Sequence, residues 1–333
     1  MNYPAPLAGF YVMNELFDVV ILGGGAAGLS AGIFAGRRGL KTLIITKEVG
    51  GQTASTLEIE NYPGVVQIEG PTLMTNMKEQ ATRFGCNFAY GNIDSIQKIG
   101  DQFVISANEQ IFQAETLIAA CGKRPRLLGL PNENEWLGKG LYYSSIDIPQ
   151  EQINDKNVVV VGGGSAALEE AILHSRTAGK VFIVHRRGSF RAEDILIQRT
   201  KEIQNIEYIY HAEVSSISGH DKIESITYTK DASFHVLFVD VVCIKIGYDS
   251  DISLFQSLLQ TDSQGRIPID HNAHTVVEGL FAAGDITNVD FQQIVISAGD
   301  GAKAALSAYF YIMNKKGVKG TKADWGYIQE HKK

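Results

Sequence analysis

Two runs of small residues in this chain have the composition and spacing of turns that bind a dinucleotide phosphate. The runs are Gly23-Gly24-Gly25-Ala26-Ala27-Gly28 and Gly162-Gly163-Gly164-Ser165-Ala166-Ala167. In such a turn one glycine permits the bend, a second lets the backbone approach a pyrophosphate, and the following helix directs its N-terminal N–H groups at the anion. The expected phosphate-binding residues are Gly23, Gly25, Ala26, Ala27 and Gly28 in the first turn, and Gly162, Gly164, Ser165 and Ala166 in the second.

A cluster of basic residues follows the second turn, and it indicates which nucleotide binds there. His185, Arg186 and Arg187 come at the end of the next apolar run, and Arg191 follows closely. Because guanidinium groups bind phosphate through paired hydrogen bonds, the cluster predicts a ribose 2′-phosphate and therefore NADPH. The alternative is a solvated basic surface with no ligand.

The corresponding position after the first turn is less distinctive. Thr46 stands where an acidic residue would contact a ribose, and Glu48 lies two residues further on. Either side chain offers an oxygen to a ribose hydroxyl. Two dinucleotide sites in one chain suggest one tightly held cofactor and one exchangeable substrate, which is the arrangement of a flavoprotein reductase.

Each turn needs a strand before it and a helix after it, and the sequence supplies both twice. The apolar run 17–22 precedes the first turn, a small-residue helical stretch covers 29–38, and a second apolar run covers 42–46. The order repeats with 157–161, 168–178 and 181–187. The repetition predicts an α/β fold with two Rossmann-like dinucleotide-binding domains.

Composition and charge exclude several classes of function. The chain has 333 residues, and its 30 Lys and Arg against 37 Asp and Glu give a net charge of −7. This balance argues against nucleic acid or an anionic membrane as the main partner. The three cysteines, Cys86, Cys121 and Cys243, are too far apart for a Cys-x-x-Cys site. The sequence also lacks a bilayer-spanning apolar run and the features of a signal peptide, so we expect a cytoplasmic protein.

From Leu16 to about Met313 these motifs resemble the low-molecular-weight thioredoxin reductases, which are FAD- and NADPH-dependent flavoproteins. The resemblance assigns the first turn to FAD and the second to NADPH. It rests further on Gly50-Gly51-Gln52, on the segment 58–64, on the crossover 121–126 and on Phe281-Ala282-Ala283-Gly284-Asp285. Besides the first turn, Thr46 and Glu48, the implied FAD contacts are Gly51, Gln52, Asn61, Gly122, Asp285, Gln293 and Ile294.

The same resemblance implies a domain plan. Residues 14–123 and 246–313 would form a discontinuous FAD-binding domain, with an NADPH-binding domain inserted at 124–245. The tail 314–333 holds six lysines together with Trp325, Tyr327 and His331. It would either place a ring over the flavin, as in related ferredoxin reductases, or form a disordered lysine-rich end. The family analogy also suggests a homodimer.

One departure from the family pattern changes the expected chemistry. The family carries a Cys-x-x-Cys dithiol just before the second turn, where this chain has Ser144 and Asp147, or Ser145 and Ile148, depending on a one-residue gap. Serine, aspartate and isoleucine cannot cycle between thiol and disulfide, so thioredoxin reduction by the usual route is improbable. The three cysteines are expected to be small buried hydrophobic residues instead.

The favoured function is therefore an NADPH-dependent FAD oxidoreductase that passes electrons from flavin directly to an external acceptor. The acceptor stays open among ferredoxin, flavodoxin, a quinone, a small disulfide and oxygen. A ferredoxin/flavodoxin–NADP reductase and a non-catalytic flavin- or nucleotide-binding regulator are the alternatives. Asp147 is a weak catalytic candidate for relaying a proton, and a solvated loop acid or helix cap is the other interpretation. No metal site is expected.

Overall fold

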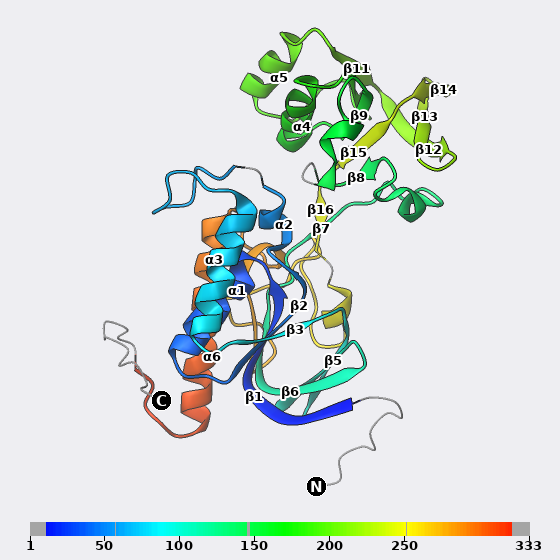
Figure 1. The fold of residues 1–333 in the computed structure, drawn as a ribbon. Helices are drawn as coiled ribbons and strands as arrows, with labels where there is room; N and C mark the ends of the chain where they lie inside the picture. Colours follow the sequence, from blue (N-terminus) through cyan, green and yellow to red (C-terminus); the bar gives the residue numbers. More distant parts are fainter. Residues whose placement is uncertain (1–10, 57, 145–146, 251, 322–333) are drawn as a thin grey trace. The chain divides into compact units, whose positions relative to one another are not determined.

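The chain folds into two compact units, each built on its own sheet. A computed structural model describes residues 11–321 apart from residues 57, 145–146 and 251 (Figure 1). Unit 1 comprises Met1–Lys123 and Ser250–Lys333, and unit 2 comprises Arg124–Asp249. We describe each unit by itself. Among the residues that the structure describes, no helix has the length and apolar character needed to cross a membrane.

Unit 1 contains a seven-stranded sheet with a parallel core. The strand order is β3-β2-β1-β6-β5-β4, and β17 pairs with β6. The pairs β1–β2, β1–β6, β2–β3 and β6–β17 are parallel, whereas β4–β5 and β5–β6 are antiparallel. The strands are β1 (Tyr11–Gly24), β2 (Thr42–Val49), β3 (Asn87–Tyr90), β4 (Ile93–Ile99), β5 (Gln102–Ala107), β6 (Gln110–Ala119) and β17 (Leu280–Ala282).

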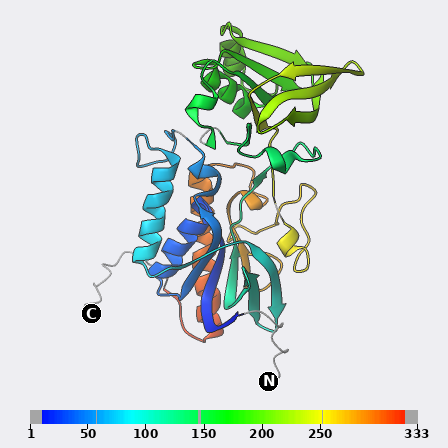
Figure 2. The same ribbon diagram turned by 45° about the vertical axis from the view of Figure 1, so that its right-hand side comes forward.

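Three helices pack along one face of this sheet, as Figures 1 and 2 show. They are α1 (Ala26–Arg37), α3 (Gly70–Arg83) and α6 (Ile294–Lys315), and the single-turn α2 (Gly51–Ala54) precedes α3. Small residues let α1 and α6 approach closely, since a Cβ added to Gly301 would lie 2.0 Å from the carbonyl oxygen of Ala27. This contact holds the start of α1 in place, directly after the first glycine turn.

Unit 2 combines a parallel sheet with a small antiparallel one. The parallel sheet has the order β11-β10-β9-β15-β8, and the antiparallel sheet has the order β12-β13-β14. Helices α4 (Ser165–Ser175) and α5 (Asp194–Lys201) accompany the parallel sheet. The strands are β8 (Leu141–Tyr142), β9 (Asn157–Gly162), β10 (Lys180–His185), β11 (Ile206–Tyr210), β12 (Ala212–Gly219), β13 (Ile223–Lys230), β14 (Ser233–Phe238) and β15 (Val241–Lys245).

The two ends of unit 2 meet each other. Strand β7 (Arg124–Pro125) pairs antiparallel with β16 (Tyr248–Asp249). Beside them the Arg126 guanidinium Nη2 lies 2.6 Å from the Asp249 carboxylate. Both connections to unit 1 therefore leave unit 2 at one place, as expected of a domain inserted into another.

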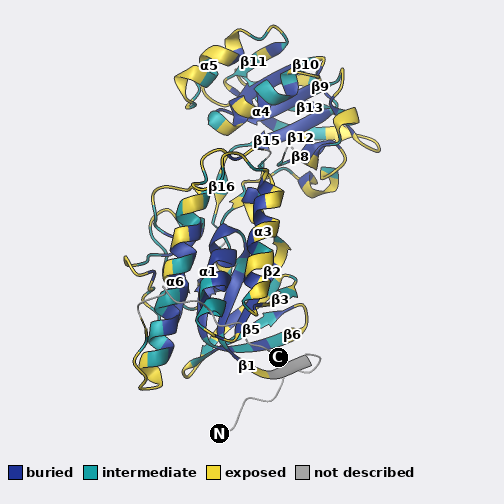
Figure 3. Ribbon diagram, turned by 60° about the vertical axis from the view of Figure 1, so that its left-hand side comes forward, coloured by how far each residue is buried: buried dark blue, intermediate teal, exposed yellow. Residues whose placement is uncertain are grey.

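The buried residues gather in the central strands of each unit's parallel sheet (Figure 3). Val19, Val20, Ile21 and Leu22 in β1 are fully buried, and so are Val158, Val159 and Val160 in β9. Continuous apolar runs of this kind are what a parallel strand covered on both faces requires. The predicted fold class, α/β with two Rossmann-like domains, is confirmed.

Candidate functional site

The first glycine turn is tightly enclosed by backbone. It lies between β1, which ends at Gly24, and α1, which begins at Ala26. Gly23 has φ +111°, and an added Cβ would lie 2.3 Å from the carbonyl oxygen of Ala120. A Cβ on Gly28 would lie 1.9 Å from the carbonyl oxygen of Gly23. Neither position can therefore accept a side chain unless the backbone moves.

The start of α1 offers its free N–H groups to an anion. Gly25 caps the helix and has no side chain to bond these groups. The N-terminus of a helix attracts negative charge through such N–H groups and through the helix dipole. The enclosed glycine turn and the uncapped helix therefore fit a pyrophosphate.

Parallel pairing brings the end of β2 beside the turn. Thr46 fills the space next to Gly24, whose added Cβ would lie 2.8 Å from the Thr46 hydroxyl oxygen. The Thr46 hydroxyl donates to the Glu48 carbonyl oxygen at 2.5 Å, and the Gly50 N–H donates to the Gly24 carbonyl oxygen at 2.8 Å. Thr46 is buried and Glu48 is exposed. Of the two predicted ribose contacts, Glu48 thus has the more accessible side-chain oxygens.

The other residues predicted to contact FAD come from distant parts of the sequence, and hydrogen bonds connect several of them within unit 1. Gln52 Nε2 donates to the Lys123 carbonyl oxygen at 3.2 Å, next to Gly122. Asn61 Nδ2 donates to Gln293 Oε1 at 3.2 Å, and α6 begins at the next residue, Ile294. Gly51 opens α2, and Asp285 accepts a hydrogen bond from the Ser297 hydroxyl at 3.0 Å.

The second glycine turn resembles the first at its start and at the position that caps the following helix. Gly162 ends β9, and a Cβ added there would lie 2.3 Å from the Lys245 carbonyl oxygen. Gly164 caps α4 without a side-chain hydrogen bond, and an added Cβ would meet nothing within 4 Å. Ser165 and Ala166 form the first turn of α4. Free space therefore adjoins the N-terminus of this helix, which fits a phosphate group.

The loop that carries the arginines is tied to this turn. The Arg191 N–H donates to the Gly163 carbonyl oxygen at 2.7 Å, and the Glu193 N–H donates to the Ser165 hydroxyl oxygen at 3.3 Å. Arg186, Arg187 and Arg191 are exposed. The backbone of this loop is thus fixed to the turn, and its three arginines are accessible to solvent, which is compatible with a 2′-phosphate site.

The side chain of His185 is buried, unlike those of the neighbouring arginines. Its ring packs against Gly163, where an added Cβ would lie 2.2 Å from the ring, and its Nε2 is 3.1 Å from the Ser189 carbonyl oxygen. Burial lowers the pKa of His185, and the neighbouring charges of Arg187, Arg191 and Arg186 lower that pKa further. The neutral imidazole therefore packs against the backbone of the turn at Gly163.

The thiol groups of Cys86 and Cys243 are buried and protonated. Burial raises the pKa of Cys86 to about 12 and that of Cys243 well above its ordinary value. Cys121 is half-buried, with its Sγ 3.5 Å from the Leu22 carbonyl oxygen. A buried protonated thiol is a poor nucleophile, so Cys86 and Cys243 have the character of small hydrophobic residues.

The segment that replaces the family's dithiol is described only in part. Asp147 is exposed and lies in unit 2, and Ser144 is half-buried with a buried hydroxyl. Ser145 lies outside the described residues. Residues 322–333 do too, so the predicted flavin cover by Trp325, Tyr327 or His331 cannot be located. The catalytic role of Asp147 stays a prediction.

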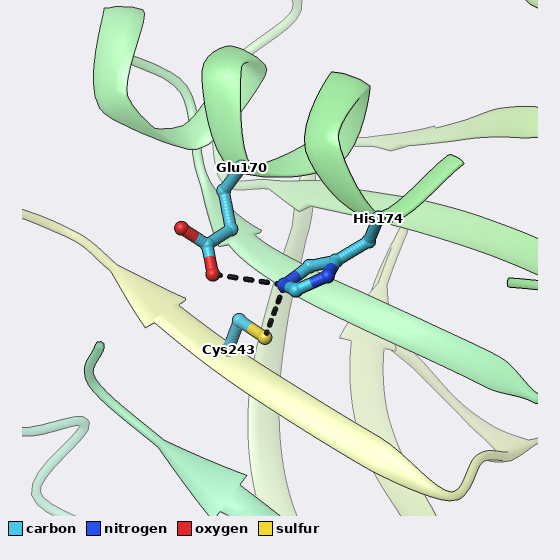
Figure 4. A group of neighbouring side chains, drawn as sticks. All are labelled: Glu170, His174 and Cys243. Carbon is cyan, nitrogen blue, oxygen red and sulfur yellow. Dashed lines mark hydrogen bonds and ion pairs between the residues drawn. The ribbon is translucent and has the colours of Figure 1, made fainter. Parts of the chain in front are cut away.

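Unit 2 contains a cluster of buried polar side chains that the sequence did not predict. Figure 4 shows Glu170 and His174, one turn apart on α4, converging with Cys243 of β15. Glu170 Oε1 lies 2.9 Å and Cys243 Sγ 3.6 Å from the same atom, His174 Nε2. In a nucleophile–base–acid triad the two partners bond opposite ring nitrogens, so this group is not one. The spacing Glu-x-x-x-His was a visible clue, whereas the cysteine comes from a distant strand.

Charge balance identifies this group as an internal ion-pair network. Lys245 Nζ lies 3.2 Å from Glu170 Oε2 and donates to the Tyr143 carbonyl oxygen at 3.0 Å. The three potential metal-ligating atoms lie within 4.8 Å of one another. However, Lys245 already balances the charge of Glu170, and a divalent ion would add uncompensated positive charge at a buried place. The network instead links the backbone carbonyl of Tyr143, through Lys245, to β15 and α4.

Comparison with known proteins agrees with this geometry. The pyridine nucleotide-disulphide oxidoreductase family profile matches residues 17–301. Thioredoxin reductase from Bacillus subtilis is 36% identical over 303 residues, which cover 90% of this chain and 96% of that protein. The crystal structure of Lactococcus lactis thioredoxin reductase in its FR conformation has a TM-score of 0.80 and 34% identity, covering 90% of this chain and 99% of that one.

A second solved structure gives the same result. The thioredoxin reductase of T. acidophilum has a TM-score of 0.78 and 33% identity, and the match covers 89% of this chain and 98% of that one. Proteins of this type use FAD and NADPH, and both turns described above fit a dinucleotide. The chain therefore belongs to the pyridine nucleotide-disulphide oxidoreductase family, as a thioredoxin reductase-like oxidoreductase whose cofactors are FAD and NADPH.

Proposed function

We propose that this protein oxidises NADPH and passes the electrons from flavin directly to an external acceptor, without a protein dithiol. Unit 1 would hold FAD at the first glycine turn, and unit 2 would hold NADPH at the second. When bound, FAD supplies a two-electron acceptor for the hydride of NADPH. The residues of the chain bind and orient the two nucleotides.

The observation that carries this proposal is the combination of an NADPH-type site with the lack of a sulfur pair. The arginine loop, tied to the second turn by Arg191 and Glu193, has the charge to bind a 2′-phosphate. Yet the 333 residues contain no Cys-x-x-Cys, and the segment 140–149 contains no cysteine. A dithiol relay needs two neighbouring sulfurs, so electrons would have to leave the flavin by another route.

In unit 1 the protein's contribution is a fixed cradle. The α1 N-terminus would bind the FAD pyrophosphate, and Glu48 would accept hydrogen bonds from a ribose. The Asn61–Gln293 and Gln52–Lys123 hydrogen bonds would hold the segments near the flavin ring in register. In unit 2 Arg186, Arg187 and Arg191 would select NADPH over NADH.

The acceptor is proposed by chemical class. Ferredoxin, flavodoxin, a quinone or a small disulfide could each take electrons from an exposed flavin. The relatives are named thioredoxin reductases, so thioredoxin belongs in the test as well. The family resemblance is also the basis for proposing a cytoplasmic homodimer.

Rapid mixing of the purified flavoprotein with NADPH in the absence of oxygen tests the proposal. We expect fast bleaching of the flavin absorbance with NADPH and much slower bleaching with NADH. After reduction, each acceptor is added in turn, with thioredoxin among them, and reoxidation is followed. Slow or absent bleaching would favour the regulator alternative, and rapid reoxidation by thioredoxin alone would overturn the dithiol-free route.

A further inference from the structure

The antiparallel sheet of unit 2 has an unusual outer edge. One face of this sheet packs into the unit, where Ile226, Tyr228 and Leu237 belong to the hydrophobic core. The other face should then be polar, and it is so on β13, where Ser225, Thr227 and Thr229 alternate with those core residues. On the adjacent edge strand β14 the outer face is apolar instead.

Three large side chains form this apolar stripe. Phe234 is 75% exposed, Val236 60% and Phe238 73%, and the register pairs them with Thr229, Thr227 and Ser225. They alternate along β14 and so share one face. We call Phe234, Val236 and Phe238 the β14 stripe. Single exposed apolar residues are ordinary, but a continuous row along a free sheet edge is not.

The backbone of β14 is also available for pairing along most of its outer edge. The Val239 N–H donates to the Glu224 carbonyl oxygen of the hairpin at 3.0 Å. Because N–H groups alternate in direction along an antiparallel strand, those of Leu237 and His235 point toward β13. The outer edge of β14, the last strand of its sheet (Figure 1), therefore presents the N–H groups of the three stripe residues and the C=O groups of Phe234 and Val236. The Phe238 carbonyl oxygen already accepts a hydrogen bond from Asn157 Nδ2 at 3.3 Å.

The opposite edge of the same sheet is protected, whereas this one is not. The pairing of β12 with β13 contains two register shifts, and β12 carries Glu213 and three serines. Bulges and polar side chains are the usual means of preventing edge-to-edge pairing. The β13–β14 pairing has no register shift, and β14 contains neither proline nor lysine. An unprotected apolar edge of this kind is suited to binding another strand.

We propose that the β14 edge binds the same edge of a second copy of this chain. The sequence Phe234-His235-Val236-Leu237-Phe238 reads alike in both directions on its outer face. In a two-fold antiparallel pair centred on Val236, each Phe234 would lie opposite the partner's Phe238. An isologous contact requires such a self-complementary surface, and cross-strand aromatic pairs stabilise a sheet.

The area of the stripe sets the expected strength. A covered aromatic side chain removes roughly 150–250 Å² from water, so the partly exposed stripe would remove on the order of 400 Å² per copy. A stable interface usually buries about 800 Å² per partner. The contact is therefore a weak, concentration-dependent one. It would add to any dimer that forms through another surface.

Sedimentation velocity of the full-length flavoprotein, from low micromolar to several hundred micromolar, tests the proposal. The wild-type protein should show a mean mass that rises toward a doubling. The double variant Phe234→Thr/Phe238→Thr should need at least about tenfold higher concentration for the same association. Ile195→Thr is the matched control, because it replaces another apolar residue of unit 2 that is 72% exposed.

A second variant separates backbone pairing from side-chain contact. Val236→Pro removes an N–H that points to the open edge, so it should spare the fold but prevent pairing. Retained flavin and an unchanged melting temperature would establish that each variant is folded. The proposal would be overturned if the wild-type protein does not associate, or if both variants associate as strongly as the wild type. Absence of association would also be the result if another protein or unit 1 covers the stripe.

Discussion

The two glycine turns begin alike and end differently. In each, a Cβ on the first glycine would lie 2.3 Å from a neighbouring carbonyl oxygen, that of Ala120 for Gly23 and that of Lys245 for Gly162. The last position of the run differs, because a Cβ on Gly28 would lie 1.9 Å from the Gly23 carbonyl oxygen, whereas its counterpart in the second run is Ala167, which already carries a Cβ. The helix-capping position is open in both turns, since an added Cβ meets only the Gly50 carbonyl oxygen at 3.8 Å at Gly25 and nothing within 4 Å at Gly164. The first turn therefore leaves no room for a side chain where its helix packs on the preceding strand, whereas the second turn accommodates the methyl group of Ala167 there.

The largest effect is expected when a side chain is added to the first turn at Gly28. Gly28→Ala would place a Cβ against the Gly23 carbonyl oxygen, which only backbone movement can relieve. We expect a loss of roughly 3 kcal/mol or more of stability and the loss of bound flavin. Flavin absorbance per protein and the melting temperature measure both. Equal flavin content in Gly28→Ala and Gly164→Ala would remove the contrast between the turns.

The second-largest effect is expected on the preference for NADPH over NADH at the second glycine turn. Replacing Arg186 and Arg187 by alanine removes charge-assisted hydrogen bonds that, at these exposed positions, are worth about 1.5–3 kcal/mol together. KM for NADPH should rise about 10- to 100-fold, while KM for NADH stays nearly constant. Steady-state kinetics with both nucleotides measures the difference. Arg199→Ala, an exposed arginine on α5 of the same unit, is the control.

Gly164→Ala should have a smaller effect, confined to NADPH. The open space around Gly164 admits a Cβ, so stability and flavin content should stay close to those of the wild type. The methyl group would stand where the backbone approaches the phosphates, and KM for NADPH should rise by roughly threefold to tenfold. An unchanged KM would show that the phosphates bind elsewhere.

The smallest effect is a dependence of stability on pH. His185 has a lowered pKa in the folded protein, so below about pH 6.5 the unfolded chain binds more protons at this site than the folded one. The stabilisation from neutral His185 is complete above that pH and is lost as the pH falls. The melting temperature of the wild type relative to His185→Phe should therefore fall on acidification. A constant difference across this range would contradict the burial effect.

The sequence predicted the glycine turns and the fold class because each rests on local pattern. Strand, turn and helix follow one another within about thirty residues, and the pattern occurs twice. The hydrogen bonds from Gln52 to Lys123 and from Asn61 to Gln293 join positions 71 and 232 residues apart, which no local pattern reveals.

Side-chain environment was harder still to predict. His185 and the arginines are adjacent in the sequence, yet the strand ends between them, so the imidazole is buried and the guanidinium groups are exposed. The Glu170–Lys245 pair joins α4 to β15 and was not foreseen. Of the three cysteines that were expected to be buried, Cys86 and Cys243 are buried, whereas Cys121 is half-buried.

The most direct test of the central claim is an anaerobic reductive titration that counts electrons per flavin. A flavin takes up two electrons, and a redox-active dithiol would take up two more. We predict that full reduction consumes one equivalent of NADPH or dithionite per FAD, with no gain in titratable thiols. Consumption of two equivalents, accompanied by the appearance of two new thiols, would contradict the account.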